Sequence, residues 1–179
     1  MTQPPGVVVA MDWGGTWVRV AVIDRSGEVL WHSRVANAPG GDKDWLLRDA
    51  EQVLRQALAW CDRRPVVGVG VAVAGPVDTE TGTLYDPPNL PALNGVCLKA
   101  LWEPLLGHRV WVGNDANLAA LGEYRYGAGR DALARGEPAR TLVYLTVSTG
   151  IGGGVVSGGQ VFLGAHGLAA EIGHMVIDR

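Results

Sequence analysis

Two glycine-rich turns and one Asn-Asp pair contain the groups in this chain most able to do chemistry. The turns span residues 12–16 and 148–154, each after an apolar strand-like run, and the pair lies between them within residues 114–117. Glycine has no Cβ, so backbone N–H groups in such turns can approach a polyanion closely. Two turns of this kind could hold the phosphates of a nucleotide, and a carboxylate could then act as a base toward an attacking hydroxyl.

The two turns differ from the common nucleotide-binding fingerprints. Each turn continues into a second strand, whereas the Rossmann turn opens a helix whose N-terminus faces the pyrophosphate. Neither turn is followed by the Lys-Ser or Lys-Thr pair of a Walker A motif. A phosphate-binding β-hairpin remains, with Asp12 placed where it could hold Mg²⁺ directly or through water. For either turn alone, a plain hairpin without a ligand is the alternative.

The Asn-Asp pair also has two interpretations. Asn114 and Asp115 precede an apolar helical segment, so both could be ordinary N-cap residues. Asn114, Asp115 and Asn117 also place three polar side chains at the end of a strand, at the sheet edge where α/β proteins bind ligands. Glu171 and His174 follow the second turn in sequence, although a lone histidine is more often structural than a ligand.

Hydrophobic periodicity predicts the elements that must position these residues. Alternating or continuous apolar runs predict strands, and apolar residues at helical spacing predict helices. The expected strands are 7–13, 17–24, 29–36, 66–74, 109–113, 141–147, 152–157 and 160–163, and the expected helices are 44–61, 95–103 and 115–126. This order predicts an α/β domain over residues 1–126, a linker over 127–140, and the incomplete start of a second domain over 141–179.

Composition bounds the class of protein. Of the 179 residues, 47% are hydrophobic and 18% are charged, and the formal net charge is −3. These values are typical of a globular protein without the basic surface that nucleic acids require. We expect no signal peptide and no membrane span, because no long apolar segment is present. Cys61 and Cys97 are isolated in sequence, which favours reduced thiols in a cytoplasmic protein.

Seven short motifs occur in an order that resembles a known family. They are Asp12-Trp13-Gly14-Gly15-Thr16, Gly75-Pro76-Val77-Asp78, Pro88-Asn89-Leu90-Pro91, Asn114-Asp115-Ala116-Asn117, Ala119-Ala120-Leu121-Gly122-Glu123, Ser148-Thr149-Gly150-Ile151-Gly152-Gly153-Gly154 and Glu171-Ile172-Gly173-His174. Together they resemble the ROK family, which contains bacterial glucokinase-like sugar kinases and sugar-sensing repressors. The resemblance implies an α/β, ribonuclease-H-like (actin-like ATPase) fold, with a mixed five-stranded sheet and the first strands of a second, similar domain.

The resemblance also implies roles for particular residues. Asp115 resembles the catalytic base toward a sugar hydroxyl, and Asn114, Asp115, Glu171 and His174 resemble the sugar ligands. The positions that resemble the two phosphate loops are Asp12, Gly14, Gly15, Thr16, Thr149, Gly150, Gly152 and Gly153. The implied cofactors are ATP and Mg²⁺, with Asp12 as the Mg²⁺ residue. Trp17 departs from the family, whose members commonly have a basic or amide residue at that position.

The end of the sequence departs further from the family. Kinases of the family continue past the Glu-x-Gly-His segment into a cysteine-rich zinc cluster and adenosine-binding helices, which these residues lack. His174 resembles a zinc ligand, but one histidine does not complete a four-coordinate structural site, so Zn²⁺ is expected only in a longer parent. We expect residues 141–179 to need a partner surface, from the first domain or from a second copy, and the protein to form a homo-oligomer.

Three functions are compatible with these observations. The first is an ATP-dependent hexose kinase with Asp115 as base, of which this chain is a truncated part that need not be active alone. The second is a sugar-sensing repressor, although such repressors carry a helix-turn-helix before the first strand, and here only residues 1–6 precede it. The third is a non-catalytic sugar-binding or interaction module. The motifs do not distinguish glucose from N-acetylglucosamine, mannose or fructose.

Overall fold

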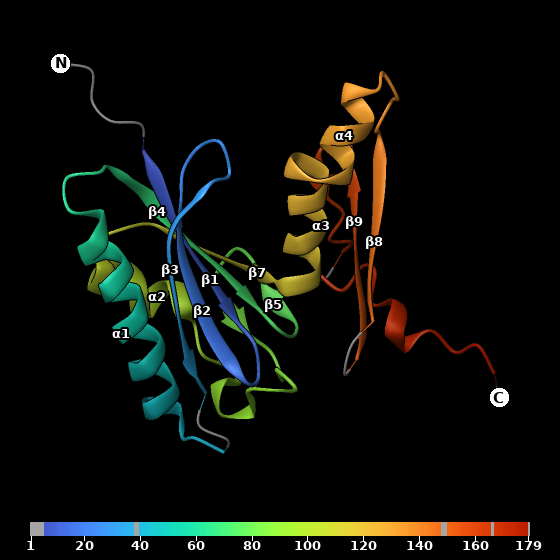
Figure 1. Ribbon diagram of the computed structural model, residues 1–179. Helices are drawn as coiled ribbons and strands as arrows, with labels where there is room; N and C mark the ends of the chain where they lie inside the picture. Colours follow the sequence, from blue (N-terminus) through green and yellow to red (C-terminus); the bar gives the residue numbers. More distant parts are fainter. Residues whose placement is uncertain (1–5, 38–39, 148–149, 166, 179) are drawn as a thin grey trace. The chain divides into compact units, whose positions relative to one another are not determined.

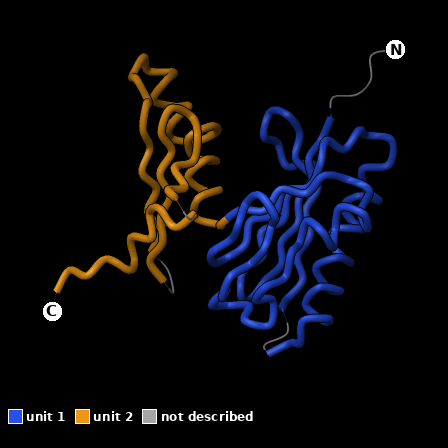
Figure 2. The backbone as a smooth tube through the Cα atoms, turned by 180° about the vertical axis from the view of Figure 1, so that it is seen from behind, with its two compact units in different colours: residues 1–113 blue, residues 114–179 orange. Residues whose placement is uncertain are grey.

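The protein folds into two compact units. The computed structural model describes residues 6–37, 40–147, 150–165 and 167–178. The first unit is Met1–Gly113 and the second is Asn114–Arg179, as the two colours of Figure 2 show. Residues 115–126 were expected in the first domain, and residues 127–140 as a linker. In the structure the dividing point between the units precedes residues 115–126, and a helix occupies residues 128–134.

The first unit is built on a mixed five-stranded sheet, which confirms the predicted fold class (Figure 1). In spatial order its strands are β3 (Val29–Ala36), β2 (Trp17–Ile23), β1 (Val7–Trp13), β4 (Val66–Val73) and β7 (Val110–Asn114). The first three strands are joined by short glycine-containing turns and pair antiparallel. β1 also pairs with β4 in parallel, because helix α1 (Lys43–Cys61) makes the crossover between β3 and β4.

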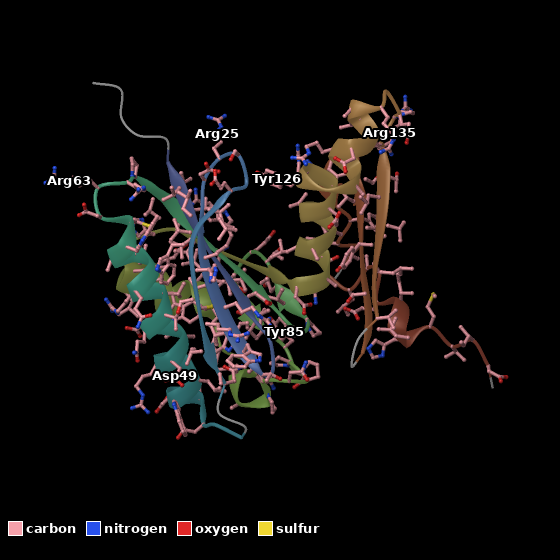
Figure 3. The ribbon with its side chains drawn as sticks, viewed as in Figure 1. Arg25, Asp49, Arg63, Tyr85, Tyr126 and Arg135 are labelled. Carbon is pink, nitrogen blue, oxygen red and sulfur yellow. The ribbon has the colours of Figure 1, made fainter. Side chains whose placement is uncertain are left out.

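Buried and exposed residues alternate along the strands, and the buried ones form the core of this unit. On β1, every second residue from Val7 to Trp13 is buried, and on β2 Val18, Val20 and Val22 are buried. Helix α1 contributes Leu46, Ala50, Val53, Leu54, Ala57 and Cys61 to the same core. Its N-cap Asp42 accepts a hydrogen bond from the Trp45 N–H at 2.8 Å. Charged residues such as Arg25 and Arg63 point outward from the turns, as Figure 3 shows.

The segment between β4 and β7 is packed rather than open. It contains a small hairpin, β5 (Val77–Asp78) with β6 (Thr83–Leu84), the 3₁₀ turn η1 (Pro91–Leu93) and helix α2 (Leu98–Leu106). Leu84, Leu90, Leu93, Leu98 and Trp102 of this segment are buried in the core. The helix extends beyond its expected end at residue 103 because Gly107 closes it in the left-handed conformation, with its N–H bonded to the Glu103 carbonyl.

The second unit consists of helices against a small antiparallel sheet. Its elements are α3 (Asp115–Tyr126), α4 (Ala128–Ala134), β8 (Thr141–Val147), β9 (Ile151–Ser157), β10 (Gln160–Val161) and the 3₁₀ turn η2 (Ile172–His174), with sheet order β10-β9-β8. A Cβ on Gly154 would lie 2.8 Å from the Ala120 Cβ, so α3 packs directly on the backbone of β9. This close packing is the reason that α3 belongs to the second unit.

β8 is an edge strand of the second sheet with one exposed apolar face. Val143, Leu145 and Val147 are 58%, 59% and 79% exposed, whereas the intervening Leu142, Tyr144 and Thr146 are partly covered. β8 pairs only with β9 among the described strands. The strand therefore has the alternation of a half-buried sheet, with large apolar side chains on its uncovered face.

Candidate active site

The first glycine turn is an opened hairpin between β1 and β2. The Gly14 N–H donates to the Trp17 carbonyl at 3.0 Å. Neither Gly14 nor Gly15 has a positive φ, so left-handed backbone does not explain these glycines. Gly15 is required by close packing instead, because a Cβ at this position would lie 2.7 Å from the Asn89 Cβ. The Pro-Asn-Leu-Pro motif is thus in contact with the first turn.

Gly15→Ala is expected to reduce the free energy of unfolding by about 1–3 kcal/mol, the usual cost of overpacking a tight contact. Gly14→Ala is the matched control, because a Cβ on Gly14 would meet only the Trp17 carbonyl oxygen at 3.8 Å. Chemical denaturation of both variants measures the difference. Asn89→Gly removes the opposing Cβ and should recover part of the loss in a Gly15→Ala background. Equal stability of the two alanine variants would contradict the assigned contact.

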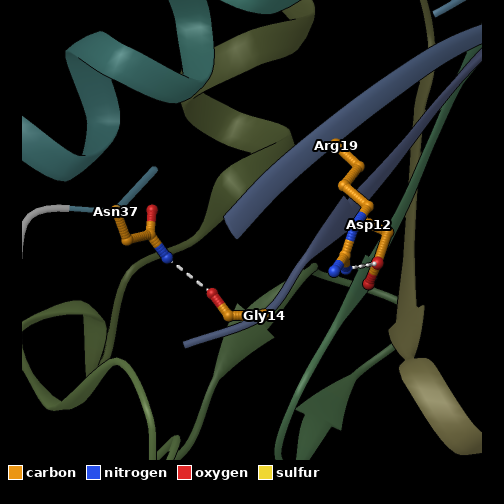
Figure 4. Close-up of polar contacts among 4 residues, drawn as sticks. All are labelled: Asp12, Gly14, Arg19 and Asn37. Atoms are coloured by element: carbon orange, nitrogen blue, oxygen red, sulfur yellow. Dashed lines mark hydrogen bonds and ion pairs between the residues drawn. The ribbon is translucent and has the colours of Figure 1, made fainter. Parts of the chain in front are cut away.

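Asp12 faces a cation on the neighbouring strand (Figure 4). The two residues are cross-strand partners, and the Arg19 Nη1 lies 2.7 Å from Asp12 Oδ2. Both side chains are about half exposed, at 53% and 47%, so the pair contributes little to stability. Within the described ranges, no three His, Cys, Asp or Glu residues are grouped to hold a metal. One carboxylate together with substrate phosphates is nevertheless a usual Mg²⁺ environment, so Asp12 fits the predicted ion.

Trp17 stands where the resemblance predicts a basic or amide residue, and a cation lies beside it. The Arg34 guanidinium lies 4.5 Å from the centre of the Trp17 ring. Arg34 is the register partner of Arg19, which is in turn the partner of Asp12. A row of one carboxylate and two guanidinium groups therefore crosses three strands near the turn.

Asn114 and Asp115 are N-terminal residues of helix α3, as one of the two interpretations predicted. Asn114 Oδ1 accepts from the Asn117 N–H at 3.0 Å, which makes Asn114 the N-cap. Asp115 Oδ1 accepts from the Ala116 N–H at 2.8 Å, and the positive end of the helix dipole favours a carboxylate there. Within the described residues, Asn117 Oδ1 is the buried side-chain oxygen that lacks a hydrogen-bond partner. Asn114 and Asp115 can therefore cap α3 and also contact a ligand.

The second glycine turn is largely explained by packing. Ser148 and Thr149 lie outside the described residues. A Cβ on Gly152 would meet the Thr146 Cγ2 at 3.2 Å, and one on Gly153 would meet the Ile172 Cδ1 at 2.6 Å. Of the three glycines predicted to bind phosphate in this turn, Gly150, Gly152 and Gly153, only Gly150 has open space where a Cβ would lie. The absence of side chains in the glycine run therefore lets α3 pack on one face of β9 and η2 on the other. This packing does not exclude a role toward phosphate.

Glu171 and His174 share the short turn η2. The His174 N–H donates to the Glu171 carbonyl at 3.1 Å, and both residues are exposed. η2 packs against Gly153 and the Ile151 backbone, which places both residues near the start of β9, as their sequence position indicated. Because side chains alternate along β9, η2 and the first turn of α3 lie on opposite faces of that strand. Within the described chain, His174 has no group of partner ligands, so the structure offers no fit for zinc.

The structure thus arranges the predicted site residues in two sets. Asp12, Gly14, Gly15 and Thr16 belong to the first unit, and Asn114, Asp115, Gly150, Gly152, Gly153, Glu171 and His174 belong to the second. One residue that the sequence did not indicate, Asn37, donates a hydrogen bond to the Gly14 carbonyl (Figure 4). No signal in the sequence singles it out, because an asparagine after a strand is an ordinary loop residue.

No helix among the described residues is long and apolar enough to span a membrane.

Comparison with known proteins supplies the family. The model of the ROK family matches residues 8–179. A glucokinase from Thermotoga maritima is 34% identical over 98% of this chain and 52% of its own length. A putative xylose repressor from a Caldicellulosiruptor species is 33% identical over 97% of this chain and 42% of its own. The chain spans about half the length of the curated relatives it matches.

Solved structures agree with these relatives. A ROK family glucokinase from Streptomyces griseus, determined in complex with glucose and AMPPNP, has a TM-score of 0.81 and 32% identity, over 97% of this chain and 51% of its own. A putative N-acetylmannosamine kinase from Listeria monocytogenes also has a TM-score of 0.81, with 30% identity, over 97% of this chain and 55% of its own. These neighbours have the actin-like ATPase fold that the sheet topology indicates. The chain therefore belongs to the ROK family.

Proposed function

We propose that the protein containing this chain is an ATP-dependent sugar kinase that phosphorylates a hexose hydroxyl, with Asp115 as the general base. The observation that carries the proposal is the position of Asp115 in the first turn of α3, directly after the N-cap at the end of β7. The glucokinases among the relatives support the choice of a sugar as acceptor and ATP as donor. This chain spans about half the length of those relatives, so the activity is proposed for the whole protein.

The residues of this chain have distinct tasks in that reaction. Asp115 accepts the proton of the attacking hydroxyl, and Asn114, Glu171 and His174 orient the sugar. Gly14, Gly15 and Thr16 of the first turn, with Thr149 and Gly150 of the second, present backbone N–H groups to the phosphates. Asp12 would help to hold Mg²⁺, which neutralises phosphate charge when bound. Phosphoryl transfer depends mainly on such positioning and charge stabilisation, and one base within reach of the acceptor is sufficient.

A sugar-sensing repressor is the second candidate. The specific observation in its favour is the similarity to xylose repressors, at 33% and 29% identity. A sensor would need the same sugar-binding residues but no turnover. A non-catalytic sugar-binding module would behave in the same way toward sugar, without binding to an operator.

Hexose-dependent ADP release by the complete natural protein tests the proposal. With ATP, Mg²⁺ and glucose, mannose, fructose or N-acetylglucosamine, at least one of these sugars should give turnover in the ordinary range of about 1–10³ s⁻¹, and xylose, a pentose, is assayed beside them. Calorimetry with each sugar is the companion measurement. Sugar binding without ADP release would favour the sensor or module, and absence of both sugar binding and turnover would contradict a sugar-directed function.

A further inference from the structure

The strongest unassigned feature of the chain is a buried hydrogen-bond relay behind the first glycine turn. Asn37 follows β3 and is 6% exposed. Its side-chain Nδ2 donates to the Gly14 carbonyl at 2.5 Å, and its backbone N–H donates to the Thr16 carbonyl at 2.9 Å. A single buried asparagine therefore bonds the carbonyl groups of two residues of the turn, Gly14 and Thr16.

Trp13 fixes the orientation of the Asn37 amide. The Trp13 indole Nε1–H donates to Asn37 Oδ1 at 3.2 Å, and an indole nitrogen can only donate. Oδ1 must therefore face Trp13, which leaves Nδ2 to face Gly14. Trp13 itself is fully buried and stacks on Trp102 of α2, with ring centres 5.6 Å apart and planes inclined by 19°. The relay thus runs from the packed core to the turn.

The relay replaces a bond that an ordinary hairpin would make. In a tight two-residue hairpin, the carbonyl before the turn accepts the N–H of the residue after it. Here the Gly14 N–H donates to the Trp17 carbonyl, but the Gly14 carbonyl accepts from Asn37. Because the Gly14–Gly15 peptide is trans, its N–H and carbonyl point in opposite directions. The Gly15 N–H therefore points away from Asn37, and within the described ranges it has no protein acceptor.

We propose that Asn37 is a positioning residue that holds the Gly14–Gly15 peptide with the Gly15 N–H directed outward as a donor for a phosphate oxygen. The inference rests on the proposed function, which makes this turn a phosphate loop, and adds the residue that presets its donor. A preset donor binds an anion more strongly than one that must first reorient, because the ordering cost is already met in the free protein.

Calorimetric titration of the 179-residue chain with Mg²⁺-tripolyphosphate tests the inference without the sugar reaction. Asn37→Ala should weaken binding about tenfold, as expected for the loss of one oriented charge-assisted hydrogen bond. Trp13→Phe keeps most of the ring stack but removes the indole N–H, so it should weaken binding by a smaller factor. Asn94→Ala is the matched control, since Asn94 also bonds a backbone group, the Asp86 N–H, away from the turn.

Amide spectra and kinetics separate positioning from general destabilisation. In Asn37→Ala, the Gly15 amide signal should move, while amide signals of α1 should not. In the complete natural protein, Asn37→Ala should raise KM for ATP about tenfold and leave KM for the sugar within about twofold. A purely structural role would lower the melting temperature and leave this ratio unchanged. If Asn37→Ala does not fold, Trp13→Phe carries the same comparison.

The outcomes distinguish this inference from the proposed function. Tripolyphosphate binding by the wild-type chain with unchanged affinity in Asn37→Ala and Trp13→Phe would overturn the role of Asn37 alone. Absence of tripolyphosphate binding by the wild-type chain would overturn both the phosphate role of the turn and the role of Asn37. Sugar-dependent turnover with an unchanged KM for ATP in Asn37→Ala would leave the kinase proposal intact and reject the inference.

Discussion

Asp115→Asn is expected to lower kcat for sugar phosphorylation by the complete natural protein by about 10²–10⁴-fold, the usual contribution of a general base. The substitution keeps the size of the side chain and leaves an oxygen able to accept from the Ala116 N–H, as Asp115 does at 2.8 Å. The helix terminus should therefore remain formed. KM for the sugar should change much less than kcat, because the lost interaction is made mainly in the transition state.

The control for this experiment is a carboxylate on the same unit without a proposed role. Asp131→Asn removes an exposed carboxylate of α4 that lies 3.7 Å from Arg130. Its kcat should stay within about twofold of wild type, since exposed pairs of this kind contribute little. ADP release under saturating ATP and sugar compares the two variants. Near-normal turnover in Asp115→Asn would remove Asp115 from the role of base.

Trp13→Ala is expected to have the largest effect on stability, a loss of about 3–5 kcal/mol in the free energy of unfolding. The substitution empties a fully buried site, removes the stack on Trp102, and leaves Asn37 Oδ1 without its donor. Equilibrium unfolding by urea measures the loss. The same variant should also lose tripolyphosphate affinity, because Asn37 is no longer held in one orientation.

Trp45→Ala is the matched control for this prediction. Trp45 lies in the first turn of α1 with 48% of its surface exposed. Its replacement should change the free energy of unfolding by much less, near the ±0.5 kcal/mol of ordinary surface substitutions. A cost for Trp13→Ala no greater than for Trp45→Ala would show that the stacked pair does not anchor the core.

Much of the first unit was predictable from sequence because its elements follow simple periods. The alternation in β1 and β2, and the helical spacing from Leu46 to Cys61, are local patterns that the structure confirms. The turn chemistry at residues 24–28 and the N-cap at Asp42 are local as well. Such features need no knowledge of distant residues.

Other features depend on contacts between distant parts of the chain and left no local signal. The motif that contains Gly154 resembles a phosphate loop, but in the structure Ala120 of α3 packs directly against the Gly154 backbone. Residues 127–140, which include α4, are rich in polar residues and contain glycine, which suggested a linker. Asn37 meets Trp13 and Gly14 across 24 and 23 positions of sequence, which no spacing rule foresees. Distant packing therefore decided the assignment of α3 and the polar relay.

The apolar segment that forms β8 also affects how the chain behaves before it is folded. The segment Thr141–Val147 has seven residues, five of them of high β-propensity and two leucines, with no charge and no proline. Segments of this kind stack readily into intermolecular cross-β assemblies when exposed, and charged neighbours act as gatekeepers against this. Arg140 supplies that charge at one end, while the other end runs into the uncharged glycine turn. Recovery of native protein after refolding should therefore fall as chain concentration rises, and a lysine in place of exposed Val143 should raise it.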